Sequence, residues 1–262
     1  MPTIDSHDGT PLYYELAGTE GKPWLTFSNS LGTNLHMWDD QMSAFENDYR
    51  ILRYDSRGHG KSGAPEGAYS IATLGGDALT LLDALGIETT LWCGLSKGGM
   101  VGMWLGTNHP ERFTRMAYCN TSAHMPTPDM WQGRARTARE QGMPALETAI
   151  IDRWFTKSFQ DGSPDRVDKV RRQILSTPGG GYAGCCEAIG AMNQRESIRA
   201  IPRPVLVIAG AEDPATPPEH GRQIAEAITG ASLIVLERAA HLSNIEQTEA
   251  FNAALERFLK AA

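Results

Sequence analysis

Short apolar runs alternate along the chain with segments that repeat apolar residues every three or four positions. The runs near the N-terminus are β-rich, and they predict strands at residues 11–16, 24–28 and 51–55. The segments between and after them predict helices at residues 37–46 and 71–85. The second helix stops at Gly86, a residue type typical of the position just past a helix end.

The same alternation continues in the middle of the chain and returns near its C-terminus. The pattern predicts further strands at residues 90–95, 115–120, 204–209 and 233–236. It predicts further helices at residues 100–105, 219–228 and 248–259. Strands that alternate with helices in this way indicate a parallel sheet with helices on both faces.

Residues 123–198 interrupt this pattern. Helical segments such as 128–142 and 143–155 follow one another there without a convincing strand. We therefore predict a core made of residues 1–122 and 199–262, with a helical cap of residues 123–198 inserted into it. A chain of 262 residues is long enough to bury such a core.

Composition and charge narrow the possible partners. The chain has 31 acidic and 24 basic residues and a formal charge of −7, which argues against a nucleic-acid surface. No apolar run approaches the length of a membrane span, and residues 1–8 lack the features of a secretory signal. Cys93, Cys119, Cys185 and Cys186 suit neither a disulfide framework nor a metal site. We expect a cytoplasmic protein without nucleic-acid or membrane partners.

The strongest chemical signal is Gly94-Leu95-Ser96-Lys97-Gly98, a G-x-S-x-G pattern. It lies where a predicted strand runs into a predicted helix, and a sharp turn there needs small residues around a strained nucleophile. The spacing alone recurs by chance, but its place between strand and helix is much rarer. We predict that Ser96 is a nucleophile; the alternative is an ordinary serine at a helix N-terminus.

A serine hydroxyl is a poor nucleophile until a base takes its proton, and an acid in turn must orient that base. His241 follows the strand at 233–236 and is our predicted base, whereas His220 falls in a predicted helix, where we expect it to pack or face solvent. Asp213, after the strand at 204–209, is the predicted acid in preference to neighbouring Glu212. Asn120 ends the preceding strand and is not a carboxylate, so it offers no other acid site.

Acyl transfer also needs donors for the negative charge that develops on the carbonyl oxygen. The first predicted donor is the backbone N–H of Lys97, directly after the nucleophile. The second is the N–H of Leu31, in the loop after the strand at 24–28. We expect the Lys97 side chain to point to solvent; the alternative is that it raises the positive potential near the site.

Together these residues resemble the 3-oxoadipate enol-lactonases of aromatic catabolism, over nearly the whole chain. The stretches that carry the resemblance are residues 29–33, 54–62, 94–99 and 240–246. Residues 55–62 recur in many α/β-hydrolases, whereas Asn29-Ser30 and residues 243–246 are more particular to the enol-lactonases. The resemblance implies an α/β-hydrolase fold: a mostly parallel eight-stranded sheet flanked by helices, with an inserted helical cap.

The resemblance also implies a reaction. The expected substrate is a small anionic enol-lactone, opened to 3-oxoadipate through an acyl-enzyme on a Ser-His-Asp triad, with no cofactor and no metal. Other readings of the same scaffold are a general carboxylesterase, an acyl-homoserine lactonase, a carbon–carbon bond hydrolase or a non-catalytic ligand receptor. A haloalkane dehalogenase is disfavoured, since it would carry a carboxylate at position 96. No heptad or exposed apolar stripe indicates an oligomeric state.

The carboxylate of such a substrate requires a cationic or hydrogen-bonding partner under the cap. Arg134 lies three residues after Trp131 and shares a helical face with it. The family resemblance places a Trp and an Arg there, so we predict that Trp131 packs on the ring and Arg134 binds the carboxylate. Trp154 is a further candidate for the pocket. The alternative is ordinary packing, with the tryptophan in the core and the arginine in solvent.

Overall fold

An eight-stranded sheet forms the centre of the fold in the computed structural model, which describes residues 2–260. The strand order is β1-β2-β4-β3-β5-β6-β7-β8. β2 pairs antiparallel with β1 and β4, and the other neighbours pair parallel, so the expected sheet is confirmed. The strands are β1 (Thr3–Asp5), β2 (Pro11–Gly18), β3 (Trp24–Ser28), β4 (Arg50–Tyr54), β5 (Thr90–Leu95), β6 (Phe113–Cys119), β7 (Val205–Gly210) and β8 (Ser232–Leu236).

β1 is the strand that the apolar pattern did not predict. It has three residues at the outer edge of the sheet, and it pairs Ile4 with Leu12. Its two end residues are exposed, so the sequence shows no alternation long enough to indicate a strand. The central strands β5 and β7 are buried throughout, which is why their apolar runs were easy to recognise.

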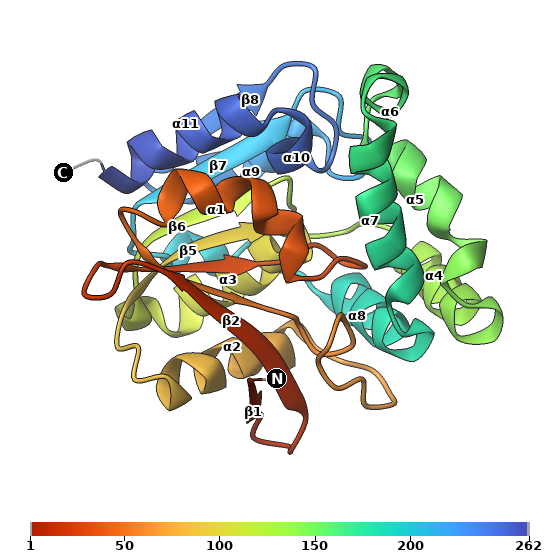
Figure 1. Cartoon of the computed structure of the whole chain (residues 1–262), viewed down its shortest axis with the longest axis horizontal. Helices are drawn as coiled ribbons and strands as arrows, with labels where there is room; N and C mark the ends of the chain where they lie inside the picture. Colours follow the sequence, from red (N-terminus) through yellow and green to blue (C-terminus); the bar gives the residue numbers. More distant parts are fainter. Residues whose placement is uncertain (1, 261–262) are drawn as a thin grey trace.

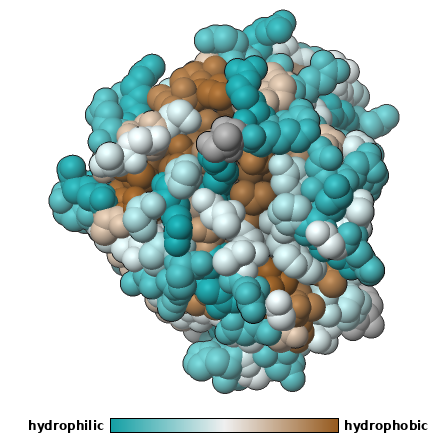
Figure 2. All heavy atoms as spheres, turned by 90° about the vertical axis from the view of Figure 1, so that its left-hand side faces the viewer, coloured by the Kyte–Doolittle hydropathy of each residue, from teal (hydrophilic) through white to brown (hydrophobic). Residues whose placement is uncertain are grey.

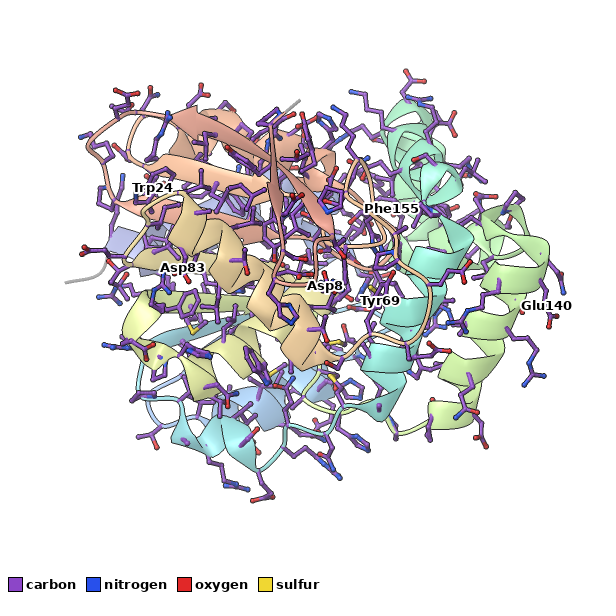
Figure 3. All side chains as sticks on the ribbon, turned by 90° about the horizontal axis from the view of Figure 1, so that it is seen from below. Asp8, Trp24, Tyr69, Asp83, Glu140 and Phe155 are labelled. Carbon is purple, nitrogen blue, oxygen red and sulfur yellow. The ribbon has the colours of Figure 1, made fainter. Side chains whose placement is uncertain are left out.

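Helices cover both faces of the sheet. α1 (Asp39–Phe45) and α11 (Thr248–Lys260) lie on one face, and α2 (Ile71–Ala84), α3 (Lys97–Asn108) and α9 (Pro218–Ala227) lie on the other (Figures 1 and 3). α11 buries Phe251, Ala254 and Leu255, which share one side of the helix at spacings of three and four. The short helices are η1 (Leu35–Trp38), η2 (Pro110–Arg112), η4 (Ser197–Ala200) and α10 (Ser243–Glu246).

The segment between β6 and β7 folds into helices that lie at the carboxyl ends of the parallel strands (Figure 1). The helices are α4 (Pro128–Gln141), η3 (Met143–Ala145), α5 (Glu147–Trp154), α6 (Lys157–Gly162), α7 (Pro164–Ser176) and α8 (Gly179–Ala191). We call them the cap helices; the division at residues 123 and 198 stays a prediction. The helix expected at 143–155 is divided: a separate 3-10 turn with Pro144 comes first, and α5 begins only at Glu147.

The cap helices touch the core at several points. The chain enters and leaves this region side by side, since the Gln194 N–H donates to Ala123 O at 2.8 Å. Gly181 of α8 lies so close to the core that a Cβ there would be 2.3 Å from the Cα of Gly58. The Leu242 N–H donates to Trp154 O at 3.1 Å. These contacts seat the cap helices over the carboxyl ends of the strands.

The face opposite the cap helices shows separate apolar patches with hydrophilic residues between them (Figure 2). Trp24 lies on this side of the molecule, far from Phe155 at the end of α5 (Figure 3). A hollow lined by Trp24, Tyr49 and Leu91 opens at the amino ends of the strands. Catalytic groups of such sheets gather at the opposite, carboxyl ends. Within residues 2–260, no helix is both long and apolar enough to cross a membrane.

Candidate active site

Ser96 occupies the sharp turn between β5 and α3. Its φ of 55° and ψ of −114° are unusual for a residue with a side chain and cost on the order of 1–3 kcal/mol of strain. The Ser96 N–H donates to Cys119 O at 2.8 Å, which ties the turn to β6. A Cβ at Gly94 would lie 2.1 Å from Gly98 O, and a Cβ at Gly98 would lie 2.1 Å from Ser28 O. Both glycines of the motif are therefore sterically required.

Asp213 and His241 lie together at the carboxyl ends of β7 and β8. Asp213 Oδ2 is 2.8 Å from His241 Nδ1, and both side chains are 97% or more buried. Glu212, the rival acid, is exposed. His241 and Ser96 line the same cavity, although no direct hydrogen bond joins their side chains within residues 2–260. Hydrogen bonds of this kind are often long before a substrate binds.

Several donors hold the Asp213 carboxylate. Its Oδ1 accepts the N–H groups of Ala215 (2.8 Å) and Thr216 (3.0 Å), and its Oδ2 accepts the Thr216 hydroxyl (2.8 Å) and the Asn120 amide (3.0 Å). Burial by itself would raise the pKa of Asp213, but the His241 ring and these donors outweigh it and lower that pKa below its ordinary value. The carboxylate is therefore ionised and fixed in one orientation toward His241.

Sequence reasoning missed two of these donors. Asn120 was set aside because it is not a carboxylate, yet it has a φ of 43° and contacts Asp213 directly. Thr216 lies three residues after Asp213. An aspartate often accepts a hydrogen bond from the backbone N–H two or three residues later, so the sequence already indicated this contact.

Replacing Thr216 with valine tests this support. Thr216→Val keeps the shape and the backbone N–H but removes the hydroxyl that donates to Asp213. We expect the free energy of unfolding to fall by about 2 kcal/mol and kcat to fall by less than about tenfold, because the other donors remain. Urea unfolding and steady-state kinetics measure the two effects. An unchanged urea midpoint would contradict the role given to this hydroxyl.

Leu31 and Lys97 are the predicted donors for the oxyanion. Leu31 lies in the loop after β3 and lines the cavity, and Lys97 is the first residue of α3. Within the described part of the chain, neither amide donates to another protein group. Two unengaged N–H groups, one at a helix N-terminus, are what a developing oxyanion requires.

The cavity between the core and the cap helices is small, about 30 Å³. Core residues around it include Ser30, Leu31, Ser96 and His241, and cap residues include Trp131, Arg134, Arg153 and Trp154. A space this narrow, enclosed by core and cap residues, excludes a polymer. Among residues 2–260, no three His, Cys, Asp or Glu side chains come together as a metal site.

Comparison with known proteins agrees with this geometry. Residues 23–248 match the profile of a family described as "alpha/beta hydrolase fold". The chain belongs to the α/β-hydrolase family. It is 44% identical to "3-oxoadipate enol-lactonase 2" of Acinetobacter baylyi, over 98% of this chain and 96% of that protein, and 36% identical to "3-oxoadipate enol-lactonase 1" of the same organism over the same shares.

A solved structure extends the likeness. The enol-lactonase from Burkholderia xenovorans superposes on this α/β-hydrolase with a TM-score of 0.97 at 43% sequence identity. The match covers 99% of this chain and all of that one. Core and cap helices are therefore arranged alike in the two proteins.

The cap of this α/β-hydrolase brings two tryptophans and an arginine to the cavity, as the sequence predicted. The Arg134 guanidinium lies 5.1 Å from the centre of the Trp131 ring and 5.6 Å from that of Tyr182, and it donates to the Tyr182 hydroxyl. The Trp154 ring stacks on His241, with centroids 6.1 Å apart. Contact between these residues and a substrate stays a prediction.

Arg153 is a cavity residue that sequence reasoning missed. It precedes Trp154 on α5 and is partly buried. Burial and the nearby charge of Arg134 lower the pKa of Arg153 below its ordinary value. Within residues 2–260, neither Arg134 nor Arg153 forms an ion pair with a carboxylate. Two uncompensated guanidinium groups therefore give the cavity a positive potential.

The Lys97 side chain contradicts the expectation that it points to solvent. It is only 1% exposed, and it is not among the cavity residues. The sharp turn at Ser96 directs the Lys97 side chain into the protein, which spacing alone could not reveal.

Proposed function

We propose that this α/β-hydrolase opens the lactone ring of 3-oxoadipate enol-lactone and releases 3-oxoadipate. The observation that carries the proposal is one cavity lined by Ser96, by His241 with Asp213 bound to its far side, and by two arginines that form no ion pair within residues 2–260. Supporting it are two relatives of nearly equal length that bear the name 3-oxoadipate enol-lactonase. A small anionic lactone matches the positive potential that the two arginines give this cavity.

The proposed reaction begins when His241 accepts the proton of Ser96 Oγ and the oxygen attacks the lactone carbonyl. Asp213 holds the imidazole and stabilises its charged form. The N–H groups of Leu31 and Lys97 stabilise the tetrahedral oxyanion. The ring C–O bond then breaks, and protonated His241 gives its proton to the enolate, which stays attached to the acyl chain and becomes a ketone.

The second half of the reaction regenerates the enzyme. His241 takes a proton from water, and the resulting nucleophile attacks the acyl carbon of the Ser96 ester. The Ser96–acyl bond breaks, Ser96 recovers its proton from His241, and the dicarboxylate leaves. One lactone and one water give one 3-oxoadipate, so no oxidant, reductant or cofactor is consumed.

A panel of substrates tests the reaction. We expect kcat/KM for the anionic enol-lactone to exceed that for p-nitrophenyl acetate and for an acyl-homoserine lactone by about 100-fold or more, because only the first offers a carboxylate to the cavity. Loss of lactone absorbance and chromatographic detection of 3-oxoadipate provide the readout. Equal kcat/KM values on all three would favour a general carboxylesterase.

We propose further that Arg134 binds the carboxylate of the substrate. Arg134→Met removes the charge but keeps much of the apolar stem that packs on Trp131. We expect kcat/KM for the anionic lactone to fall about 10- to 100-fold, mainly through KM, since a charged hydrogen bond contributes about 1.5–3 kcal/mol. Hydrolysis of p-nitrophenyl acetate should change little.

Two matched variants accompany this test. Tyr182→Phe removes the hydroxyl to which Arg134 donates but leaves both guanidinium groups, so it should retain the preference for the anionic lactone. Arg153→Met removes the other charge, and its kcat/KM on the anionic lactone and on the neutral ester shows how much Arg153 contributes to the preference for the anion. Equal losses on charged and neutral substrates in Arg134→Met would refute the assigned role.

We also propose that the protein works in the cytoplasm. Cys93 Sγ and Cys119 Sγ lie 4.0 Å apart on neighbouring strands without forming a disulfide, and all four cysteines are free and buried. A reducing compartment suits this arrangement.

A further inference from the structure

Lys97 is a buried cation without a partner. Its side chain is 1% exposed, and its Nζ forms no hydrogen bond within the described residues. Transfer of an ammonium group from water into a protein interior destabilises the fold unless a carboxylate or other acceptor compensates it. Such a group directly after the nucleophile requires an explanation that packing does not supply.

The charged and titratable groups that face Lys97 come from three parts of the structure. They are Asp55 and His59 in the loop after β4, Asp77 in α2 and Cys185 in α8. Both carboxylates are engaged elsewhere. Asp77 binds Arg57 through both oxygens, at 2.5 and 2.6 Å, and Asp55 accepts the N–H groups of Leu35 and Lys61. The Lys97 charge is therefore not neutralised by direct contact.

His59 connects the buried surroundings of Lys97 to the loop after β3, which we call the oxyanion loop because it contains Leu31. Its Nε2 accepts the N–H of Gly32, the residue after Leu31, at 2.8 Å, and its Nδ1 is 3.1 Å from Arg57 O. Because Nε2 accepts, Nδ1 carries the proton and the ring is neutral. Burial and the charge of Lys97 hold the pKa of His59 well below its ordinary value, which keeps the ring neutral. The charge of Lys97 thus acts on the side chain that holds the loop of Leu31, a residue that lines the cavity.

We propose that the Lys97 ammonium supports the reaction electrostatically, from behind the oxyanion loop, by stabilising the negative charge of the tetrahedral intermediate without touching the substrate. The inference rests on the proposed role of Ser96 as the nucleophile. A fixed charge in a region without water acts strongly on a developing charge and needs no reorganisation during the reaction. The burial of Lys97 then lowers the free energy of unfolding, and the protein tolerates this loss because the charge increases the rate of the reaction.

The protonation of Lys97 gives the proposal a pH signature. Burial lowers the pKa of Lys97 below its ordinary value, so the side chain becomes neutral at a lower pH in the folded state than in the unfolded chain. We expect kcat to fall as pH rises through that lowered pKa. The stability cost is full below the lowered folded-state pKa and fades as pH rises from there to the ordinary unfolded-state pKa.

Lys97→Met tests the proposal with p-nitrophenyl acetate, whose hydrolysis passes through the same kind of oxyanion but needs no carboxylate. We expect kcat to fall about tenfold with KM nearly unchanged, and the alkaline decline of kcat to disappear. The inhibition constant of phenylboronic acid, which forms a tetrahedral anion on a serine, should rise by about the same factor. The melting temperature should rise by at least about 2 °C at pH 7.

Controls separate this effect from its neighbours. Cys185→Ala removes the thiol that faces Lys97 and should leave the alkaline decline of kcat in place. Lys97→Gln provides a second neutral side chain if Lys97→Met does not fold. A kcat and a boronic acid constant within twofold of wild type would overturn the proposal, as would a loss of kcat that accompanies a lower melting temperature.

Ser96→Ala distinguishes this inference from the proposed function. If Ser96→Ala leaves ester hydrolysis intact, the nucleophile assignment fails and this proposal fails with it. If Ser96→Ala abolishes hydrolysis while Lys97→Met matches wild type, only the role of Lys97 is refuted.

Discussion

Ser96→Ala should reduce kcat for the enol-lactone by about 10⁵-fold or more, to the level of residual catalysis by the oxyanion donors alone. Ser96 and His241 both line the cavity, and loss of the Ser96 hydroxyl leaves His241 without the nucleophile that it activates. The fold should persist, because the strained turn is held by the Ser96 backbone, whose N–H bonds to Cys119 and whose carbonyl accepts the Thr121 hydroxyl at 2.7 Å.

Single-turnover kinetics and mass spectrometry measure this effect directly. Wild type should accumulate an acylated form when mixed with p-nitrophenyl acetate, and Ser96→Ala should show none. A non-catalytic receptor would give a folded wild type with no turnover that depends on Ser96. An unchanged melting temperature in Ser96→Ala shows that lost activity is lost chemistry and not lost structure.

Asp213→Asn should lower kcat by about 10³- to 10⁴-fold. In wild type, donors from His241, Thr216 and Asn120 converge on Asp213 Oδ2. An asparagine would place either its NH₂ group or its one oxygen at that position. Either orientation leaves a buried donor unpaired or favours the wrong tautomer of the imidazole. KM should change far less than kcat, because Asp213 does not line the cavity.

Glu212→Gln is the matched control for this substitution. Glu212 is the neighbouring carboxylate, but it is exposed, so its replacement should leave kcat within about twofold. A large loss in Glu212→Gln together with a small one in Asp213→Asn would reverse our assignment of the acid.

The pH dependence of stability offers a second readout for Asp213. The folded-state pKa of Asp213 lies below its ordinary value, so the ionised carboxylate stabilises the fold at any pH above the unfolded-state pKa. That contribution is lost as pH falls through the lowered folded-state pKa. We therefore expect wild type and Asp213→Asn to differ most in unfolding free energy near neutral pH and to converge in acid.

More basic side chains gather near the candidate site than the sequence predicted. Arg134 was expected from its spacing to Trp131, Arg153 was not, and the Lys97 side chain was expected in solvent. Arg134 and Arg153 both line the cavity, in a chain whose formal charge is −7. Net charge therefore says little about the potential inside a cavity.

The order of most strands and helices, the G-x-S-x-G turn and the predicted roles of Ser96, Asp213 and His241 follow from the amino-acid sequence alone. These features are local, because apolar periodicity, glycine at a tight turn and the position of a residue after a strand are all written in neighbouring residues. The same local patterns missed the edge strand β1 and the separate turn at Pro144, because each has only three residues.

Contacts between residues that are distant in the sequence depend on the tertiary structure. Asn120 and Asp213 are 93 positions apart in the chain but bonded in the fold, and His59 reaches Gly32 across a separate loop. The same holds for Lys97, whose burial depends on the backbone direction at Ser96 and on α8 packing behind it. Packing between distant segments determines which side chains meet, how deeply they are buried and the electrostatic potential around them. A pattern in neighbouring residues does not contain this information.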